Sequence, residues 1–186
     1  MRWRIGALLV VAVGVTTLVW AQPATTSRDA GVAAWQTVYA VLENPRCRNC
    51  HPIGDAPLQF DDGRPHGQNI TRRSERNGVP CATCHREHNG TRAGQPPGAP
   101  NWHLPPAATP MIFEGRSSTQ LCEQLKDPTQ TGGRDLAGLV HHVADDPLVG
   151  WGWDPGAGRT PAPGTQKQFG ELIKAWADAG AICPTS

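Results

Sequence analysis

The chain has little net charge, few apolar residues and almost no methionine. It carries 17 Lys and Arg against 16 Asp and Glu, a formal net charge of +1. No basic stripe or cationic amphipathic helix is visible, which argues against nucleic acid or an anionic lipid surface as a partner. Apolar residues make up only 38% of the chain, beside 21 glycines and 18 prolines. Such a composition buries little, so we expect a loop-rich fold that needs an additional apolar core.

The N-terminal residues have the features of an export signal. Arg2 and Arg4 form a basic start, an apolar stretch covers 5–20, and small residues end at Ala21, where a signal peptidase would cleave. A spanning helix needs about 20 mostly apolar residues, so a cleaved signal is favoured over an uncleaved anchor. We predict a signal peptide over 1–21, a flexible linker over 22–30 and one domain over 31–186. The predicted location is the periplasm, without stable membrane insertion after cleavage.

Two copies of one motif, Cys-x-x-Cys-His, stand at 47–51 and 81–85. This is the attachment motif of a c-type haem. Two thiols at this spacing reach the two vinyl groups of one porphyrin, and the adjacent imidazole binds the iron. The sequence therefore predicts two covalent haems c as cofactors. The predicted thioether cysteines are Cys47, Cys50, Cys81 and Cys84, and the predicted proximal iron ligands are His51 and His85.

The four motif cysteines also have an alternative interpretation as the two Cys-x-x-Cys knuckles of a zinc ribbon. Export disfavours it, because reduced structural thiols are uncommon outside the cytosol, where haem attachment takes place. The two remaining cysteines, Cys122 and Cys183, are candidates for a disulfide in an exported protein. Their alternative is a pair of buried thiols without a bond, since the geometry decides.

The sixth position on each iron is less determined by the sequence. The mature chain has one methionine, Met111, which cannot serve two irons, so either at least one haem has two histidine ligands or at least one iron is open. His66 and His103 are candidate distal ligands, with an exposed loop histidine as the alternative for His66. His103 is flanked by Trp102, Leu104 and prolines, which implies burial. Met111 is an alternative distal ligand or a core methionine.

The other histidines are weaker candidates. His88 follows His85 by three residues, so we expect both on one face of a continuing helix, from which His88 cannot reach the opposite face of that haem. On a predicted helix over 135–145, His142 lies at the edge of the apolar face and His141 nearly opposite it, in solvent.

Apolar spacing near 3.6 residues predicts helices over about 30–42, 135–145 and 166–178, and a capped helix from Ser117 that ends before Pro128. Turn residues predict loops between the motifs, over 90–110 and over 149–164. The fold class expected is mainly α: a loop-rich dihaem cytochrome c with short helices packed around two covalent haems.

Several runs of the chain resemble small exported bacterial dihaem cytochromes, some of which carry the label isoquinoline 1-oxidoreductase subunit. The matching runs are 51–59, 65–69, 102–106, 124–128 and 151–153, and the resemblance covers about Trp35 to Pro184. It implies the haem roles of the two motifs and favours His66 and His103, which fall inside matching runs, as distal ligands.

The function expected is one-electron transfer in the periplasm, with redox proteins as partners and with a role as subunit or partner of a dehydrogenase. On this interpretation the protein is a carrier and not an enzyme. The alternative is a dihaem peroxidase-like enzyme with one open haem iron, although the sequence has no distal Arg-His pair at helical spacing. A third interpretation is a scaffold subunit that docks a dehydrogenase through the loop at 151–153.

Overall fold

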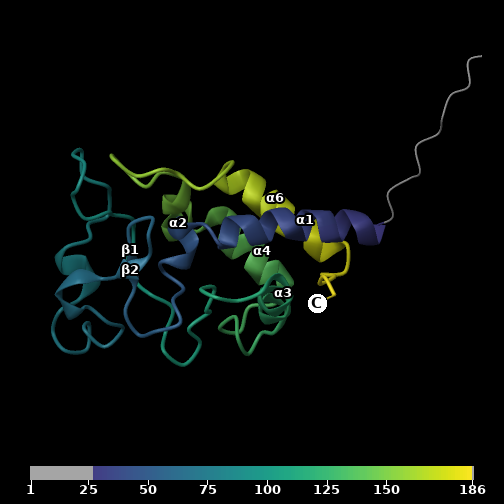
Figure 1. Ribbon diagram of the computed structural model, residues 1–186, viewed down its shortest axis with the longest axis horizontal. Helices are drawn as coiled ribbons and strands as arrows, with labels where there is room; N and C mark the ends of the chain where they lie inside the picture. The colour runs from purple at the N-terminus through teal and green to yellow at the C-terminus, as the bar shows by residue number, and fades with distance from the viewer. Residues whose placement is uncertain (1–26, 186) are drawn as a thin grey trace, which may run out of the picture.

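The computed structural model describes residues 27–185, and its longest elements are four α-helices (Figure 1). They are α1 (Ser27–Leu42), α3 (Ser118–Lys126), α4 (Leu136–Asp145) and α6 (Gln166–Asp178). The shorter elements are α2 (Pro45–Arg48), α5 (Pro147–Gly150), three 3-10 turns, η1 (Gly67–Asn69), η2 (Cys81–Thr83) and η3 (Trp151–Trp153), and the strands β1 (Leu58–Gln59) and β2 (Arg64–Pro65). The mainly α, loop-rich class predicted from the sequence is confirmed.

The described residues divide into two regions of different regularity (Figure 1). The helical region consists of α1 and of α3 to α6. The loop region, residues 49–116, lies at the end of the molecule away from the start of α1 and contains β1, β2, η1 and η2. The two strands pair antiparallel, with Leu58 opposite Pro65. Both Cys-x-x-Cys-His motifs have their histidine in the loop region.

The apolar core lies in the helical region, where α1 and α4 pack against α6. Trp35 of α1 and Trp176 of α6 are fully buried, with ring centroids 5.0 Å apart. Gly170 lets α6 approach α4 closely, because a Cβ at that position would lie 2.7 Å from the Cβ of Ala144. The helical spacing of the apolar residues therefore points them into one core, as the sequence predicts.

Side-chain caps fix where the predicted helices begin. Ser117 forms a capping box with Gln120 at the start of α3, and Asp135 accepts a hydrogen bond from the Gly138 amide at the start of α4. Thr165 accepts one from the Gln168 amide at the start of α6. Each cap satisfies an amide that has no partner inside its helix, which contributes about 1 kcal/mol.

Two segments predicted as linker or loop contain helical turns among the described residues. The predicted signal peptide and residues 22–26 of the predicted linker lie outside the described residues. Residues 27–30 of that linker form the first turn of α1, where the negative charge of Asp29 suits the helix N-terminus. The segment predicted as a loop over 149–164 starts with helical turns of α5 and η3, because the Asp146 carboxylate accepts a hydrogen bond from the Leu148 amide.

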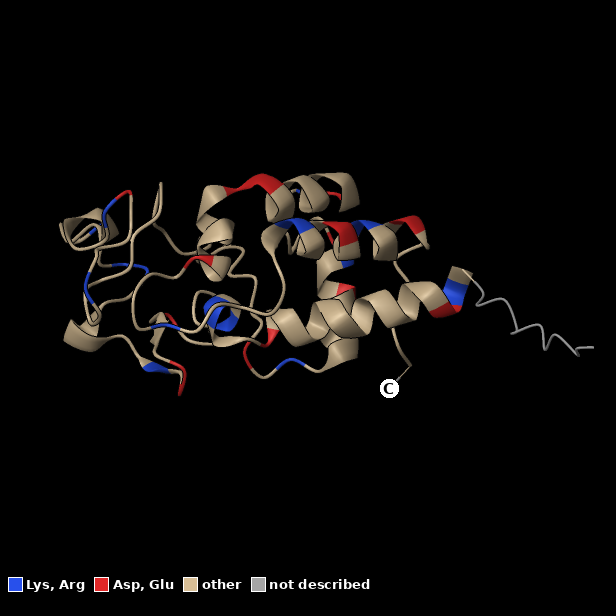
Figure 2. Ribbon diagram, turned by 90° about the horizontal axis from the view of Figure 1, so that it is seen from above, with Lys and Arg blue, Asp and Glu red and all other residues tan. Residues whose placement is uncertain are grey.

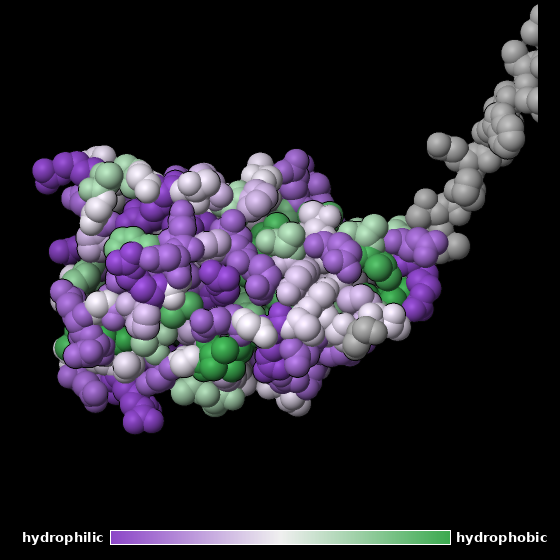
Figure 3. Space-filling view, in the orientation of Figure 1, coloured by the Kyte–Doolittle hydropathy of each residue, from purple (hydrophilic) through white to green (hydrophobic). Residues whose placement is uncertain are grey.

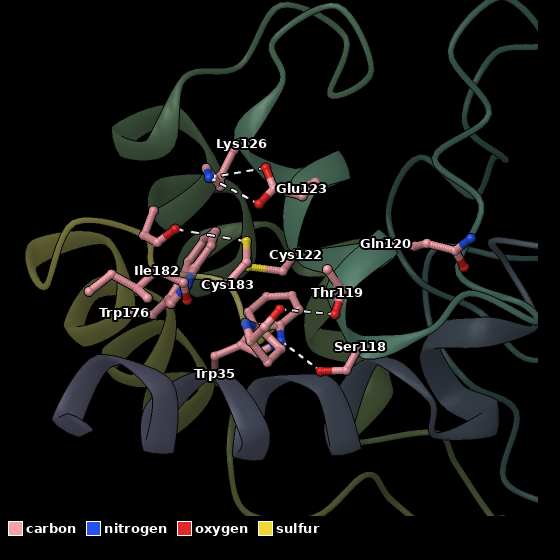
Figure 4. Close-up of a disulfide and its surroundings, with 12 residues drawn as sticks. Trp35, Ser118, Thr119, Gln120, Cys122, Glu123, Lys126, Trp176, Ile182 and Cys183 are labelled. Carbon is pink, nitrogen blue, oxygen red and sulfur yellow. Dashed lines mark hydrogen bonds and ion pairs between the residues drawn. A yellow bond between two sulfur atoms is a disulfide. The ribbon is translucent and has the colours of Figure 1, made fainter. Parts of the chain in front are cut away.

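A disulfide joins Cys122 of α3 to Cys183 in the tail after α6 (Figure 4). The two Cα atoms lie 5.6 Å apart, and the cysteines are 61 residues apart in sequence. Beside the disulfide, the Thr119 hydroxyl donates a hydrogen bond of 3.0 Å to the Pro184 carbonyl. The disulfide predicted from the sequence is confirmed, and a loop of this length corresponds to about 4 kcal/mol in the chain-entropy account.

The surface carries charges of both signs. Figure 2 shows Lys and Arg interspersed with Asp and Glu along the described chain. The face seen in Figure 3 is mostly hydrophilic, with apolar patches separated from one another. No helix among residues 27–185 combines the length and the apolar composition that crossing a membrane requires.

Candidate haem-binding site

The first motif begins in the short helix α2 and ends just after it. Pro45 occupies the first turn, and the Asn44 side chain caps the helix by accepting a hydrogen bond from the Arg46 amide. Cys47 therefore lies in α2, and the His51 amide donates a hydrogen bond of 2.9 Å to the Arg48 carbonyl. The helical conformation brings Cys47, Cys50 and His51, spaced by three and four residues, to one side of the chain, as attachment to one porphyrin requires.

The second motif is held by the 3-10 turn η2 instead of an α-helix. Pro80 precedes the turn, and the His85 amide donates to the Cys81 carbonyl at 3.0 Å. The helix expected to continue to His88 does not form, so the placement of His88 on a shared helix face with His85 is wrong. His88 is exposed in the segment after the turn.

Asn89 explains why the helix stops. Its amide nitrogen donates to the Asp154 carbonyl at 2.7 Å, and its Oδ1 accepts from the Gly98 amide at 3.0 Å and from the Trp151 indole at 3.1 Å. These long-range hydrogen bonds draw the chain away from the motif and toward η3. The sequence carries no short-range signal for them, because their partners come from distant segments.

The Nδ1 atoms of the two motif histidines have the same kind of hydrogen-bond partner, a backbone carbonyl. The Nδ1 atom of His51 lies 2.7 Å from the Met111 carbonyl oxygen, and that of His85 lies 2.7 Å from the Pro97 carbonyl oxygen. A carbonyl oxygen only accepts, so each Nδ1 carries the proton and each Nε2 offers a lone pair. A backbone carbonyl on the second ring nitrogen is the usual partner of a metal-bound histidine.

Aromatic rings also support both imidazoles. His51 stacks on Phe113, with centroids 3.8 Å apart and planes at 11°, and His85 stacks on Trp102 at 4.5 Å and 3°. Trp102 in turn meets the edge of Trp151 at 5.1 Å. The imidazole rings of His51 and His85 are thus each held in orientation by a hydrogen bond and by a stacked aromatic ring. The sequence indicated burial near Trp102 but not its contact with His85.

Burial keeps the cysteines and the histidine of the first motif uncharged. Desolvation lowers the pKa of His51 to about 4, so its imidazole is neutral at pH 7, as a metal ligand must be. Burial also lowers the pKa of His85. The same effect raises the pKa of Cys47 to about 12 and that of Cys50 to about 11, so both are held as thiols and not as thiolates.

Residues of both motifs line one cavity of about 760 Å³. Its size lies in the range of small-molecule and cofactor sites, about 300 to 1,000 Å³. The wall includes thiols and imidazoles of the predicted site, aromatic rings and guanidinium groups: Cys50, Cys81, Cys84, His66, His85, His103, Trp102, Trp151, Arg46 and Arg159. Cys50 of the first motif and Cys81 and Cys84 of the second line this cavity together, so both motifs contribute to one space.

His66 is the predicted distal candidate whose ring lies near that of His85, the predicted proximal ligand. Its ring centroid lies 6.2 Å from that of His85, with the planes at 61°. Two imidazoles on opposite faces of one iron, each with a metal–nitrogen bond of about 2 Å, have centroids about 6 Å apart. The Nδ1 of His66 lies 2.8 Å from the Gly67 carbonyl, which leaves its Nε2 with a lone pair.

His103 and Met111 have different positions. The Nδ1 of His103 lies 2.6 Å from the Asn101 carbonyl, and the residue lines the cavity while remaining exposed. The Met111 carbonyl binds the Nδ1 of His51, and the residue packs at the edge of the apolar core. Met111 is therefore held at the Nδ1 edge of His51, away from the Nε2 side where an iron and its opposite ligand would lie.

His142 lies nearer to the first motif than the sequence suggested. Its side chain is 31% exposed, its Nδ1 is 3.2 Å from Asp146 Oδ2, and burial lowers its pKa. When His142 is protonated, its charge contributes to the lowered pKa of His51. His141 points its Nδ1 to Asp145 and is 80% exposed, in agreement with the solvated position predicted for it.

Buried polar groups near the motifs have atoms without partners in the described structure. They are Asn49 Oδ1, between the cysteines of the first motif, and Arg72 Nη2, whose charge acts on His51. In addition, no three His, Cys, Asp or Glu side chains within 27–185 gather as a metal ion would require. Cys50, Cys81 and Cys84 line the cavity, and the described thiols are not gathered into a tetrahedral cluster of the zinc-ribbon kind. Thiols, imidazoles with free Nε2 atoms and an apolar cavity together fit haem c.

Comparison of the chain with protein-family models, with curated proteins and with solved structures gave no match.

Proposed function

We propose that the chain is a dihaem c-type cytochrome that transfers single electrons between redox proteins of the periplasm. The two Cys-x-x-Cys-His motifs are the basis of this proposal, and one structural observation supports it most. The rings of His66 and His85 line the same cavity with their centroids 6.2 Å apart, close to the spacing of two axial ligands on one iron. A low-spin iron with two histidine ligands suits electron transfer, since it has no open position for a substrate.

In this proposal each residue has a defined task. Cys47 and Cys50 attach one haem and Cys81 and Cys84 the other, while His51 and His85 bind the irons from the proximal side. Haem c supplies the reversible one-electron change of its iron. The protein supplies the hydrogen bonds from Nδ1 that increase the basicity of the ligands and the apolar walls that limit access of water.

Covalent haem is the first property to measure. The full chain is produced with export and haem attachment active, and the mass of the purified protein is determined beside the absorption of the denatured protein. Two haems per chain are expected, and one haem for the Cys84→Ala variant. A chain that carries zinc and no haem would contradict the proposal.

His66→Ala tests the axial pair. Loss of this imidazole leaves the iron bound to His85 without its sixth ligand, so about half of the haem is expected to change from low spin to high spin. Near-infrared and EPR spectra of the oxidised protein measure the change, and added imidazole should reverse it. His88→Ala, which removes an exposed histidine of the same loop region, is the matched control. Unchanged low-spin spectra for His66→Ala would rule out this ligand.

A second candidate function follows from the other motif. Among the aromatic pairs of the described residues, His51 is stacked on Phe113 and faces no second imidazole as His85 does. An iron on His51 without a sixth ligand would be open to peroxide, which is the requirement of a dihaem peroxidase. The same spectra separate the alternatives, because an open iron gives a high-spin signal in the unmodified protein, whereas ligation by His142 or His103 gives a second low-spin signal.

A further inference from the structure

Two guanidinium groups lie in one wall of the large cavity. Arg46, the residue before Cys47, has a side chain that is 4% exposed and forms an ion pair with Asp61. Its guanidinium also lies over the Trp151 ring, 5.8 Å from the centroid. Arg159, in the segment after η3, is half-buried and donates hydrogen bonds to the carbonyls of Pro155 and Gln95. Both arginines line the cavity.

The charges around this wall are not balanced. The carboxylates that line the cavity are Asp61, which pairs with Arg46, and Asp62, which pairs with Arg64 in the exposed hairpin. The ion pairs within residues 27–185 include none to Arg159, whose hydrogen-bond partners are backbone carbonyls. Burial and the positive charge of Arg46 both lower the pKa of Arg159. A half-buried cation of this kind is stabilised by an anion.

The cavity also restricts which anion can bind. The guanidinium fork of Arg159 matches the two oxygens of a carboxylate. The wall around it carries apolar groups, among them Phe60, Val79 and Trp102. The complementary ligand has a large apolar body and a carboxylate at its edge, which is the chemistry of a haem with its propionate groups.

We infer that Arg159, with Arg46 beside it, binds a propionate carboxylate of the haem in this cavity and thereby raises the reduction potential of that haem. The inference rests on the proposed function. The physical reason is that a nearby positive charge disfavours the additional positive charge of the oxidised iron. Arg46 has Asp61 and Trp151 as further partners, so Arg159 is the residue whose charge can be changed with the least effect on the first motif.

The test is a spectroelectrochemical titration of the dihaem protein and of three variants. Arg159→Gln is expected to lower the potential of one haem and leave the other unchanged. The expected size is a three- to tenfold shift of the oxidation equilibrium, about 30 to 60 mV for one electron. Arg159→Lys keeps the charge and should shift less than Arg159→Gln. Arg92→Gln, which removes an exposed charge from the same part of the loop region, should match the unmodified protein.

A resonance Raman spectrum adds a readout that does not depend on potential. The propionate bending bands of one haem are expected to move in Arg159→Gln and in Arg159→Lys, so the measurement stands even where only one of the two variants accumulates. Potentials and bands equal to those of the unmodified protein would overturn the inference, as would an equal shift in Arg92→Gln. Absence of haem from the unmodified protein would instead overturn the proposed function, so the two failures are distinguishable.

Discussion

The helical region and the loop region are held together in different ways. In the helical region, Trp35 and Trp176 are fully buried and pack against each other inside a continuous apolar core. In the loop region, Ile53, Phe60 and Val79 are large apolar residues that stay 46 to 64% exposed, and the last two line the cavity. The comparison teaches that one region is stabilised by its own side chains, whereas the other surrounds a space that an apolar ligand would fill.

Truncation of the core is expected to have the largest effect. Trp176→Ala removes a fully buried ring from between α6 and α1, together with the hydrogen bond of its indole to the Ile182 carbonyl. The free energy of unfolding should fall by about 3 to 5 kcal/mol. Denaturant unfolding followed by circular dichroism measures this value. Ile53→Ala, at a position that is 64% exposed, should change it by less than about 0.5 kcal/mol.

Removal of the proposed haem attachment sites should affect the loop region more than the helical region. A variant with alanine at all four motif cysteines binds no covalent haem. Amide hydrogen exchange is expected to become faster in the loop region by a factor of about 100 or more, because its cavity is then unfilled, and to remain slow in α1, α4 and α6. Equal loss of protection in both regions would show that the helical core also depends on haem.

Loss of the Asn89 side chain should have a smaller and local effect. Asn89→Ala removes one donor and one shared acceptor, so we expect the free energy of unfolding to fall by about 1 to 3 kcal/mol. Faster exchange at the Gly98 amide would locate the change in the loop region. Asn77→Ala, at an exposed position of the same region, is the control and should leave exchange at Gly98 unchanged.

The sequence predicted best what depends on neighbours in the chain. Helices α3, α4 and α6 follow from caps and from apolar spacing, and the disulfide follows from two unassigned cysteines in an exported chain. Helix α1 begins at Ser27, a few residues before the start that apolar spacing predicts. Short α2 and the hairpin of β1 and β2 have too few residues to produce a periodic signal.

The parts of the candidate site that the sequence left open depend on contacts between distant segments. The sequence predicts His66 as a ligand candidate, but its ring comes within 6.2 Å of His85, centroid to centroid, through the fold of the loop region after the hairpin of β1 and β2. The stacking of Trp102 on His85 and the cavity positions of Arg46 and Arg159 have the same origin. The predicted helix between His85 and His88 does not form, and Asn89 instead makes hydrogen bonds to Asp154 and Trp151, 65 and 62 residues away.

Cys50 and Cys81 line the same cavity, which bears on the order of haem attachment and thiol oxidation in the proposed dihaem protein. Both thiols line one cavity, while Cys122 and Cys183 are paired in the helical region. In an oxidising compartment, free thiols are substrates for disulfide formation, although the raised pKa of Cys50 slows a reaction that proceeds through the thiolate. A bond between Cys50 and Cys81 would consume one thiol of each motif. For the proposed dihaem protein, delivery of haem therefore has to precede oxidation, and the shared cavity makes assembly a kinetic competition.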